Sequence, residues 1–73
     1  MPPRRLPYRE VVRRLVAAGF AQVSQRGSHV KLRKSAPGRT LTTVVPRHRE
    51  IAVGLLRAIL RQAELTWEEF ERL

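Results

Sequence analysis

Apolar residues recur at helical spacing in two segments of the chain. The first stripe predicts an amphipathic helix over residues 8–18, with Pro7 in its first turn and Gly19 as its C-cap. Charged residues, Arg14 among them, are expected on the opposite, exposed side of this helix. The second stripe predicts a helix over residues 53–63. The first stripe consists of Val11, Val12, Leu15 and Val16, and the second of Leu55, Leu56, Ile59, Leu60 and Ala63.

Between these two segments the pattern becomes that of β-strands. Three short runs alternate in polarity or are rich in Thr and Val, as strands are, and they cover residues 20–26, 29–34 and 39–45. Gly27-Ser28 suits a two-residue β-hairpin loop in which glycine takes a positive φ angle. A turn at residues 35–38 joins the second run to the third, and Pro46 stops the third. Residues 47–52 are then expected to form a connecting loop.

Folding the first two runs about Gly27-Ser28 separates basic from apolar side chains. Residues that lie opposite each other in an antiparallel pair share a face of the sheet. One face then carries Arg26 opposite His29, Ser24 opposite Lys31 and Gln22 opposite Arg33. The other face carries Ala21, Val23, Val30 and Leu32, and from the third run we expect Leu41, Thr43 and Val45 to point the same way.

The predicted order is α-β-β-β-α with a short helix appended, which is an α+β fold. Helices should cover the apolar face of a three-stranded antiparallel sheet and leave its basic face open. Thr66 and Glu69 fit a capping box at the start of the last helix, and Leu65 and Phe70 are spaced as a hydrophobic staple. Trp67, Phe70 and Tyr8 occupy helical positions that predict core packing rather than base stacking.

Length and composition bound the function. A chain of 73 residues is expected to form one domain, with residues 1–7 as a flexible arm. Cysteine is absent, which excludes disulfides and thiolate metal sites. Asp is also absent, and two histidines without cysteine make no zinc site, so we expect no metal and no cofactor. No signal peptide or apolar run of membrane-spanning length is present in the sequence, which predicts a cytoplasmic protein without membrane contact.

Charge is the strongest global property of the sequence. The formal net charge is +9, and it is unevenly distributed. Four of the six acidic residues lie in the last ten positions, so the rest of the chain is more basic still. A compact body of this charge indicates a polyanionic partner, and nucleic acid is the first candidate. The alternative is a soluble, arginine-rich protein with no such partner.

His29 is the candidate for chemistry on this basic face. Cleavage of RNA by its own 2′-hydroxyl needs a base, an acid and cations that balance the charge on phosphorus, and it needs no metal. Histidine suits proton transfer near neutral pH, and Arg26, Lys31 and Arg33 could hold the phosphate. The alternative is that His29 is an ordinary surface residue beside a turn.

The remaining candidates lie in the hairpin loop and before the second helix. Ser28 could bond a phosphate or serve only the turn. His48 could be a partner acid, or it could position the loop before the second helix. Arg47 and Arg49 are expected to contact backbone phosphate, since such contacts position RNA without specifying its sequence.

An ordered set of short motifs resembles the HicA toxins, also called YcfA-like mRNA interferases. The motifs are Gly19-Phe20, Gly27-Ser28-His29, Val45-Pro46-Arg47-His48, Gly54-Leu55-Leu56 and Ile59-Leu60-Arg61-Gln62-Ala63. The resemblance implies a fold like that of the double-stranded-RNA-binding domain, cleavage of mRNA, and a HicB-type antitoxin as partner. It implies that His29 is the catalytic histidine. The chain departs from the family pattern at Val30, where many relatives have a polar residue, and at Glu64, where relatives usually have glycine.

These observations predict a toxin-type endoribonuclease with His29 as its catalytic group. The RNA-binding residues would be Arg26, Gly27, Ser28, Lys31, Arg33, Arg47 and His48. Two alternatives remain open at this point: a non-catalytic module that binds double-stranded or structured RNA, and a protein whose basic face docks an acidic partner.

Overall fold

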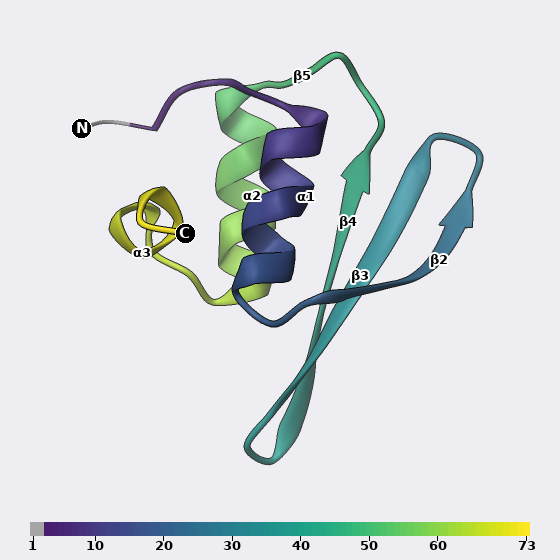
Figure 1. Cartoon of the computed structure of the whole chain (residues 1–73), viewed down its shortest axis with the longest axis vertical. Helices are drawn as coiled ribbons and strands as arrows, with labels where there is room; N and C mark the ends of the chain where they lie inside the picture. The colour runs from purple at the N-terminus through teal and green to yellow at the C-terminus, as the bar shows by residue number, and fades with distance from the viewer. Residues whose placement is uncertain (1–2) are drawn as a thin grey trace.

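The computed structural model describes residues 3–73. Three antiparallel strands form one sheet in the order β2-β3-β4 (Figure 1). The α+β class and the predicted order of the three strands and three helices are confirmed. The elements in chain order are β1 (Leu6–Pro7), α1 (Tyr8–Ala17), β2 (Ala21–Arg26), β3 (His29–Ala36), β4 (Arg39–Pro46), β5 (Glu50–Ile51), α2 (Val53–Ala63) and α3 (Trp67–Glu71).

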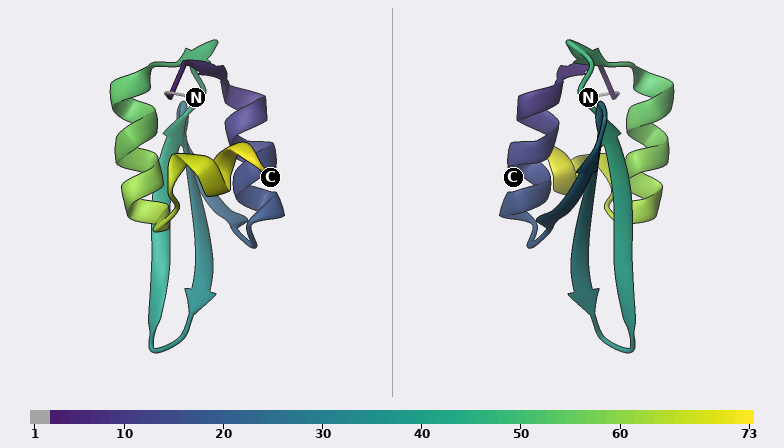
Figure 2. Two further views of the ribbon diagram at one scale, coloured as in Figure 1. Left: turned by 90° about the vertical axis from the view of Figure 1, so that its left-hand side faces the viewer. Right: turned by 90° about the vertical axis from the view of Figure 1, so that its right-hand side faces the viewer.

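The helices all lie on one side of this sheet. Figure 2 shows that α1 and α2 lie next to each other over one face of the sheet. Helix α3 crosses over them on the side away from the strands. The sheet side chains turned toward the helices are buried, and they include Val30, Leu32, Thr43 and Val45 as predicted. The opposite face has no helix over it (Figure 2, right). Burial of one face leaves the other free for polar and charged residues.

Strand β2 departs from the predicted register at one point. Arg26 pairs with His29 and Ser24 with Lys31, as expected, but Gln22 pairs with Leu32 instead of Arg33. Val23 is the extra residue of a β-bulge between them, and its side chain is 46% exposed. The prediction that Ala21 and Val23 line the core was therefore wrong, since all of β2 is exposed. Bulges of this kind are common on edge strands, where they interrupt pairing with other chains.

Helix α1 buries a narrower stripe than its apolar pattern predicts. Val11 and Leu15 are fully buried, whereas Val16 is 52% exposed. Arg14, expected on the exposed side, is buried because α3 packs over it. Gly19, with φ of 105°, lies just beyond the C-cap residue, a conformation that glycine adopts without strain.

The N-terminal segment is more ordered than the predicted arm. Leu6 and Pro7 form β1, which pairs with β5 of the supposed connecting loop, and Leu6 and Ile51 are both buried. The expectation of a flexible arm over residues 1–7 is thus wrong at its C-terminal end, while residues 1 and 2 lie outside the described part of the chain. A two-residue strand has no periodicity, so the sequence pattern could not predict this pair.

The C-terminal helices follow the sequence closely. Helix α2 has the predicted bounds, and its stripe is buried except for the half-buried Leu55. Thr66 and Glu69 form the predicted capping box, with the Thr66 hydroxyl accepting from the Glu69 amide at 3.1 Å. Between the helices, Glu64 takes the left-handed conformation at φ of 56° that glycine would favour.

Candidate active site

The β2–β3 hairpin presents His29 at the edge of the open face. Gly27 has φ of 58°, the left-handed angle that a two-residue hairpin loop requires, and a Cβ at this position would meet no neighbouring atom. The loop brings Arg26 directly opposite His29. His29 also pairs with Pro46 of β4 on its other side, so two neighbouring strands hold its backbone. The hairpin thus places an exposed imidazole on a rigid strand end.

Basic, polar and apolar residues surround His29 in a partly open depression. The depression has a volume of about 620 Å³, and it is lined by Ser24, Gln25, Arg26, His29, Lys31 and Val44. Lys31 lies two residues from His29 on β3, and its pairing with both Ser24 and Val44 places all of them on one face. The predicted grouping of Arg26, His29 and Lys31 is therefore present in the structure.

Several residues of the predicted basic face and hairpin loop lie apart from this depression. Arg33 shares the open face but is four residues from His29, roughly 13 Å along an extended strand. The bulge turns Gln22 to the other face, opposite Leu32. Gly27 and Ser28 shape the turn and are not among the lining residues. Arg26 and Lys31 are thus the cations nearest to the imidazole on the strands.

Val44 is a lining residue that the sequence analysis did not single out. It is 38% exposed, an uncommon position for valine, and it lies opposite Lys31. The inward placement of Thr43 and Val45 already implied that Val44 points outward, since side chains alternate along a strand. Val44 therefore adds an exposed apolar surface to the depression.

The cations of this face take no part in the ion pairs that the described residues form. Within residues 3–73 the ion pairs engage Arg4, Arg5, Arg13, Arg14 and Arg39, and none engages Arg26, Lys31 or Arg33. The carboxylates that form ion pairs lie elsewhere, on the N-terminal segment, on the helices and after α2, where Glu64 pairs with Arg39. An anion on the open face therefore meets positive charge that is not already compensated.

The loop after β4 lies against the hairpin turn. The Arg47 amide donates to the Ser28 carbonyl at 2.6 Å, so the start of this loop is tied to the residue before His29. The Arg47 guanidinium lies over the ring of Tyr8, 5.7 Å from its centroid. His48 lines a second depression with Tyr8 and Arg9, and the two histidines do not share a depression.

Comparison with known families agrees with this architecture. The sequence profile of the HicA toxin of bacterial toxin–antitoxin systems matches residues 8–65, most of the chain. The chain belongs to the HicA toxin family. A search of curated proteins found no match. Membership of this family implies that the partner is a cognate antitoxin. Among the described residues, none of the helices has the length and apolar character to cross a membrane.

Proposed function

We propose that this HicA toxin is an endoribonuclease that cleaves mRNA by metal-independent general acid/base catalysis, with His29 as the catalytic group. The observation that carries the proposal is the exposed imidazole in a depression with Arg26 and Lys31, on a face without compensating carboxylates among the described residues. Histidine moves protons near neutral pH, and nearby cations stabilise charge that develops on phosphate.

The reaction uses the RNA as its own nucleophile. The 2′-hydroxyl oxygen forms a bond to the adjacent phosphorus, its proton passes to a base, and the bond from phosphorus to the 5′-oxygen breaks as that oxygen receives a proton. The products are a 2′,3′-cyclic phosphate and a 5′-hydroxyl end. In this proposal His29 takes the first proton or supplies the second, and Arg26 and Lys31, which share its depression, neutralise the charge on the non-bridging oxygens.

The surroundings of His29 favour RNA over a small phosphate ester as the substrate. The depression is only partly enclosed and lies on the exposed face of a sheet, whereas small-molecule sites bury most of the ligand's surface. Val44 offers the only large apolar side chain in its lining, suited to one ribose or base. The sheet carries no paired aromatic residues for stacking successive bases, so most of the binding should come from phosphate contacts.

A HicB-type antitoxin would act by covering this face. The cations that hold RNA phosphate would also attract an acidic protein surface, and a protein seated over His29 would keep RNA out. Because mRNA is the substrate and the antitoxin is made in the same cell, we place the activity in the cytoplasm. A toxin–antitoxin complex that leaves His29 and Arg26 exposed would contradict this part of the proposal.

The decisive test is cleavage of mRNA by purified toxin with EDTA present throughout. We expect His29→Ala to lower kcat at least about 100-fold while RNA affinity changes little, because general acid/base groups contribute about 10²–10⁴-fold. Arg26→Gln should raise KM, weaken the salt dependence of binding and lower kcat less than His29→Ala does. Equal cleavage by wild type and His29→Ala would refute the role of His29. Binding without cleavage by the wild type would favour a non-catalytic RNA-binding module.

His48→Ala distinguishes a mechanism with one histidine from one with two. Since His48 lines the other depression, its loss should raise KM and leave kcat close to that of the wild type. A loss of kcat as large as that of His29→Ala would show that both histidines move protons.

A further inference from the structure

A second basic depression lies at the junction of α1 and the β4–β5 loop. Its volume is about 430 Å³, and its lining includes Tyr8, Arg9, Arg47, His48, Arg49 and Glu50. Three arginines face a single carboxylate here, and Glu50 is itself engaged by Arg5 at 3.4 Å. Within residues 3–73, Arg9, Arg47 and Arg49 take part in no ion pair. The depression is therefore suited to an anion.

The sequence brings these residues together from segments far apart in the chain. Arg9 belongs to the first turn of α1, whereas Arg47 and Arg49 precede β5. Pairing of β1 with β5 holds the two segments side by side, through Leu6 opposite Ile51. The Arg47 guanidinium over the Tyr8 ring adds a contact between them. The cluster is thus a product of the short two-stranded sheet that the sequence pattern did not predict.

A backbone hydrogen bond ties Arg47 of this depression to the hairpin that carries His29. Pro46 pairs with His29, and the next residue, Arg47, donates its amide to the carbonyl of Ser28. The cations of the second depression therefore begin one residue beyond the strand pair that carries the imidazole. RNA carries a negative charge on every nucleotide, and Arg47 and the cations beyond it lie next to the strand pair that carries His29.

We propose that this second depression is a phosphate subsite for a nucleotide that flanks the scissile phosphate, so that the substrate is single-stranded RNA spanning both depressions. The inference rests on the proposed function and adds a subsite and a strand path to it. Arg9 and Arg49 contact the flanking phosphate, and the Arg47 guanidinium, held by Tyr8, offers a plane on which an unstacked base can lie. An acidic segment of a protein is the competing occupant, and the experiment distinguishes the two.

The test measures binding of uncleaved RNA in the His29→Ala background. We expect Arg9→Gln/Arg49→Gln to weaken binding of a single-stranded oligoribonucleotide at least about tenfold at low salt. The slope of log Kd against log salt concentration should fall by about 0.7, since the variant loses the contact with one flanking phosphate and each such contact on a single strand contributes about 0.7. A matched control is Arg57→Gln/Arg61→Gln, which removes the same charge from an exposed face of α2. The control should change affinity much less.

Substrate length provides the second readout. A dinucleotide has one phosphodiester, which occupies the His29 depression alone, so Arg9→Gln/Arg49→Gln should bind it as the His29→Ala protein does. Equal loss of affinity for the dinucleotide and the longer RNA would contradict a separate subsite. So would a double variant that binds RNA like the control but binds the antitoxin less tightly, which would assign the depression to the protein partner.

These outcomes are independent of those that test the proposed function. Binding is measured without cleavage, so a wild-type protein that fails to cleave RNA overturns the catalytic proposal and leaves the subsite standing. If the toxin cleaves RNA but Arg9→Gln/Arg49→Gln leaves its RNA affinity unchanged, the subsite alone is refuted.

Discussion

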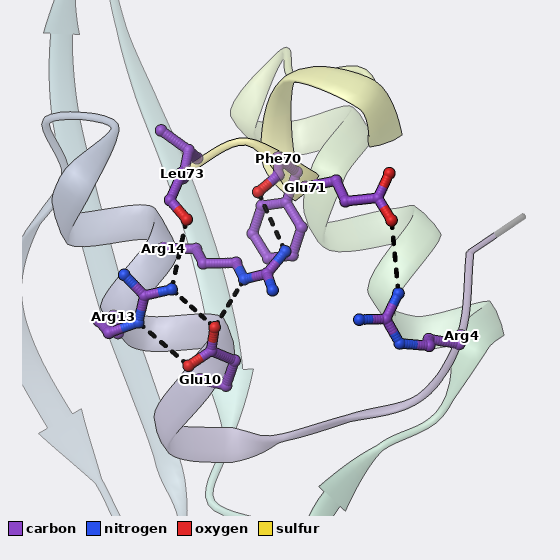
Figure 3. A network of polar contacts seen from close by, with 7 residues as sticks. All are labelled: Arg4, Glu10, Arg13, Arg14, Phe70, Glu71 and Leu73. Carbon is purple, nitrogen blue, oxygen red and sulfur yellow. Dashed lines mark hydrogen bonds and ion pairs between the residues drawn. The ribbon is translucent and has the colours of Figure 1, made fainter. Parts of the chain in front are cut away.

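Arg14 should hold the C-terminal helix on the rest of the protein. Its side chain is buried between α1 and α3, where Nε donates to Glu10 at 2.8 Å and a terminal nitrogen donates to the Phe70 carbonyl at 3.2 Å (Figure 3). Its guanidinium carbon also lies 5.4 Å from the centroid of the Phe70 ring. We therefore expect Arg14→Met, which keeps the aliphatic stem, to destabilise the protein.

The expected loss is about 2 kcal/mol. A hydrogen bond from a charged donor contributes about 1.5–3 kcal/mol, and a cation–π contact adds about 0.5–1 kcal/mol. The cost of burying the guanidinium, which Arg14→Met removes, offsets part of this sum. Glu10 keeps its two bonds from Arg13, at 3.0 and 2.7 Å, so the substitution leaves no carboxylate without a partner.

Equilibrium unfolding in guanidinium chloride and thermal unfolding measure this effect. A loss of about 2 kcal/mol in a domain of this size lowers Tm by about 8–16 °C. Arg13→Met is the matched control, because Arg13 binds the same carboxylate from an exposed position and should change stability little. Equal stabilities of Arg14→Met and Arg13→Met would refute the argument that burial, and not the ion pair itself, makes Arg14 important.

Three further predictions concern stability. Hydrogen bonds from Arg13 and Arg14 lower the pKa of Glu10 from 4.5 to about 2, so the stabilisation by this carboxylate is fully present above pH 4.5 and is lost as the pH falls toward 2. The difference in stability between wild type and Glu10→Gln, measured by chemical unfolding at each pH, should therefore shrink as the pH falls from 4.5 to 2. A difference that stays constant over this range would contradict the lowered pKa of Glu10. Thr66→Ala removes the capping box and should lower the free energy of unfolding by about 1 kcal/mol in the same assay. An unchanged free energy of unfolding would show that the cap contributes no stability. Glu64→Gly relieves the left-handed backbone, so it should raise Tm in an Arg39→Gln background, where the ion pair of Glu64 is already absent; an unchanged or lower Tm would argue against strain there.

Local patterns determined most of the elements. The bounds of α2, the capping box at Thr66 and the two-residue hairpin at Gly27 were predictable, because each depends on residues that are neighbours in the chain. The pairing of Arg26 with His29 followed from the same hairpin. The candidate catalytic position was therefore accessible from the sequence, together with its closest basic neighbour.

The tertiary structure alone decided which faces are covered and which distant segments meet. The alternation of polar and apolar residues predicted that Val23 is buried, but the bulge leaves it exposed. Strand β2 lies at the edge of the sheet and is exposed throughout, so a regular register there would bury no apolar side chain. Arg14 is buried because α3, more than fifty residues later, packs over it. Arg9 and Arg49 meet because β1 pairs with β5. Contacts between residues far apart in the chain depend on the packing of whole elements, and no periodicity in the sequence records them.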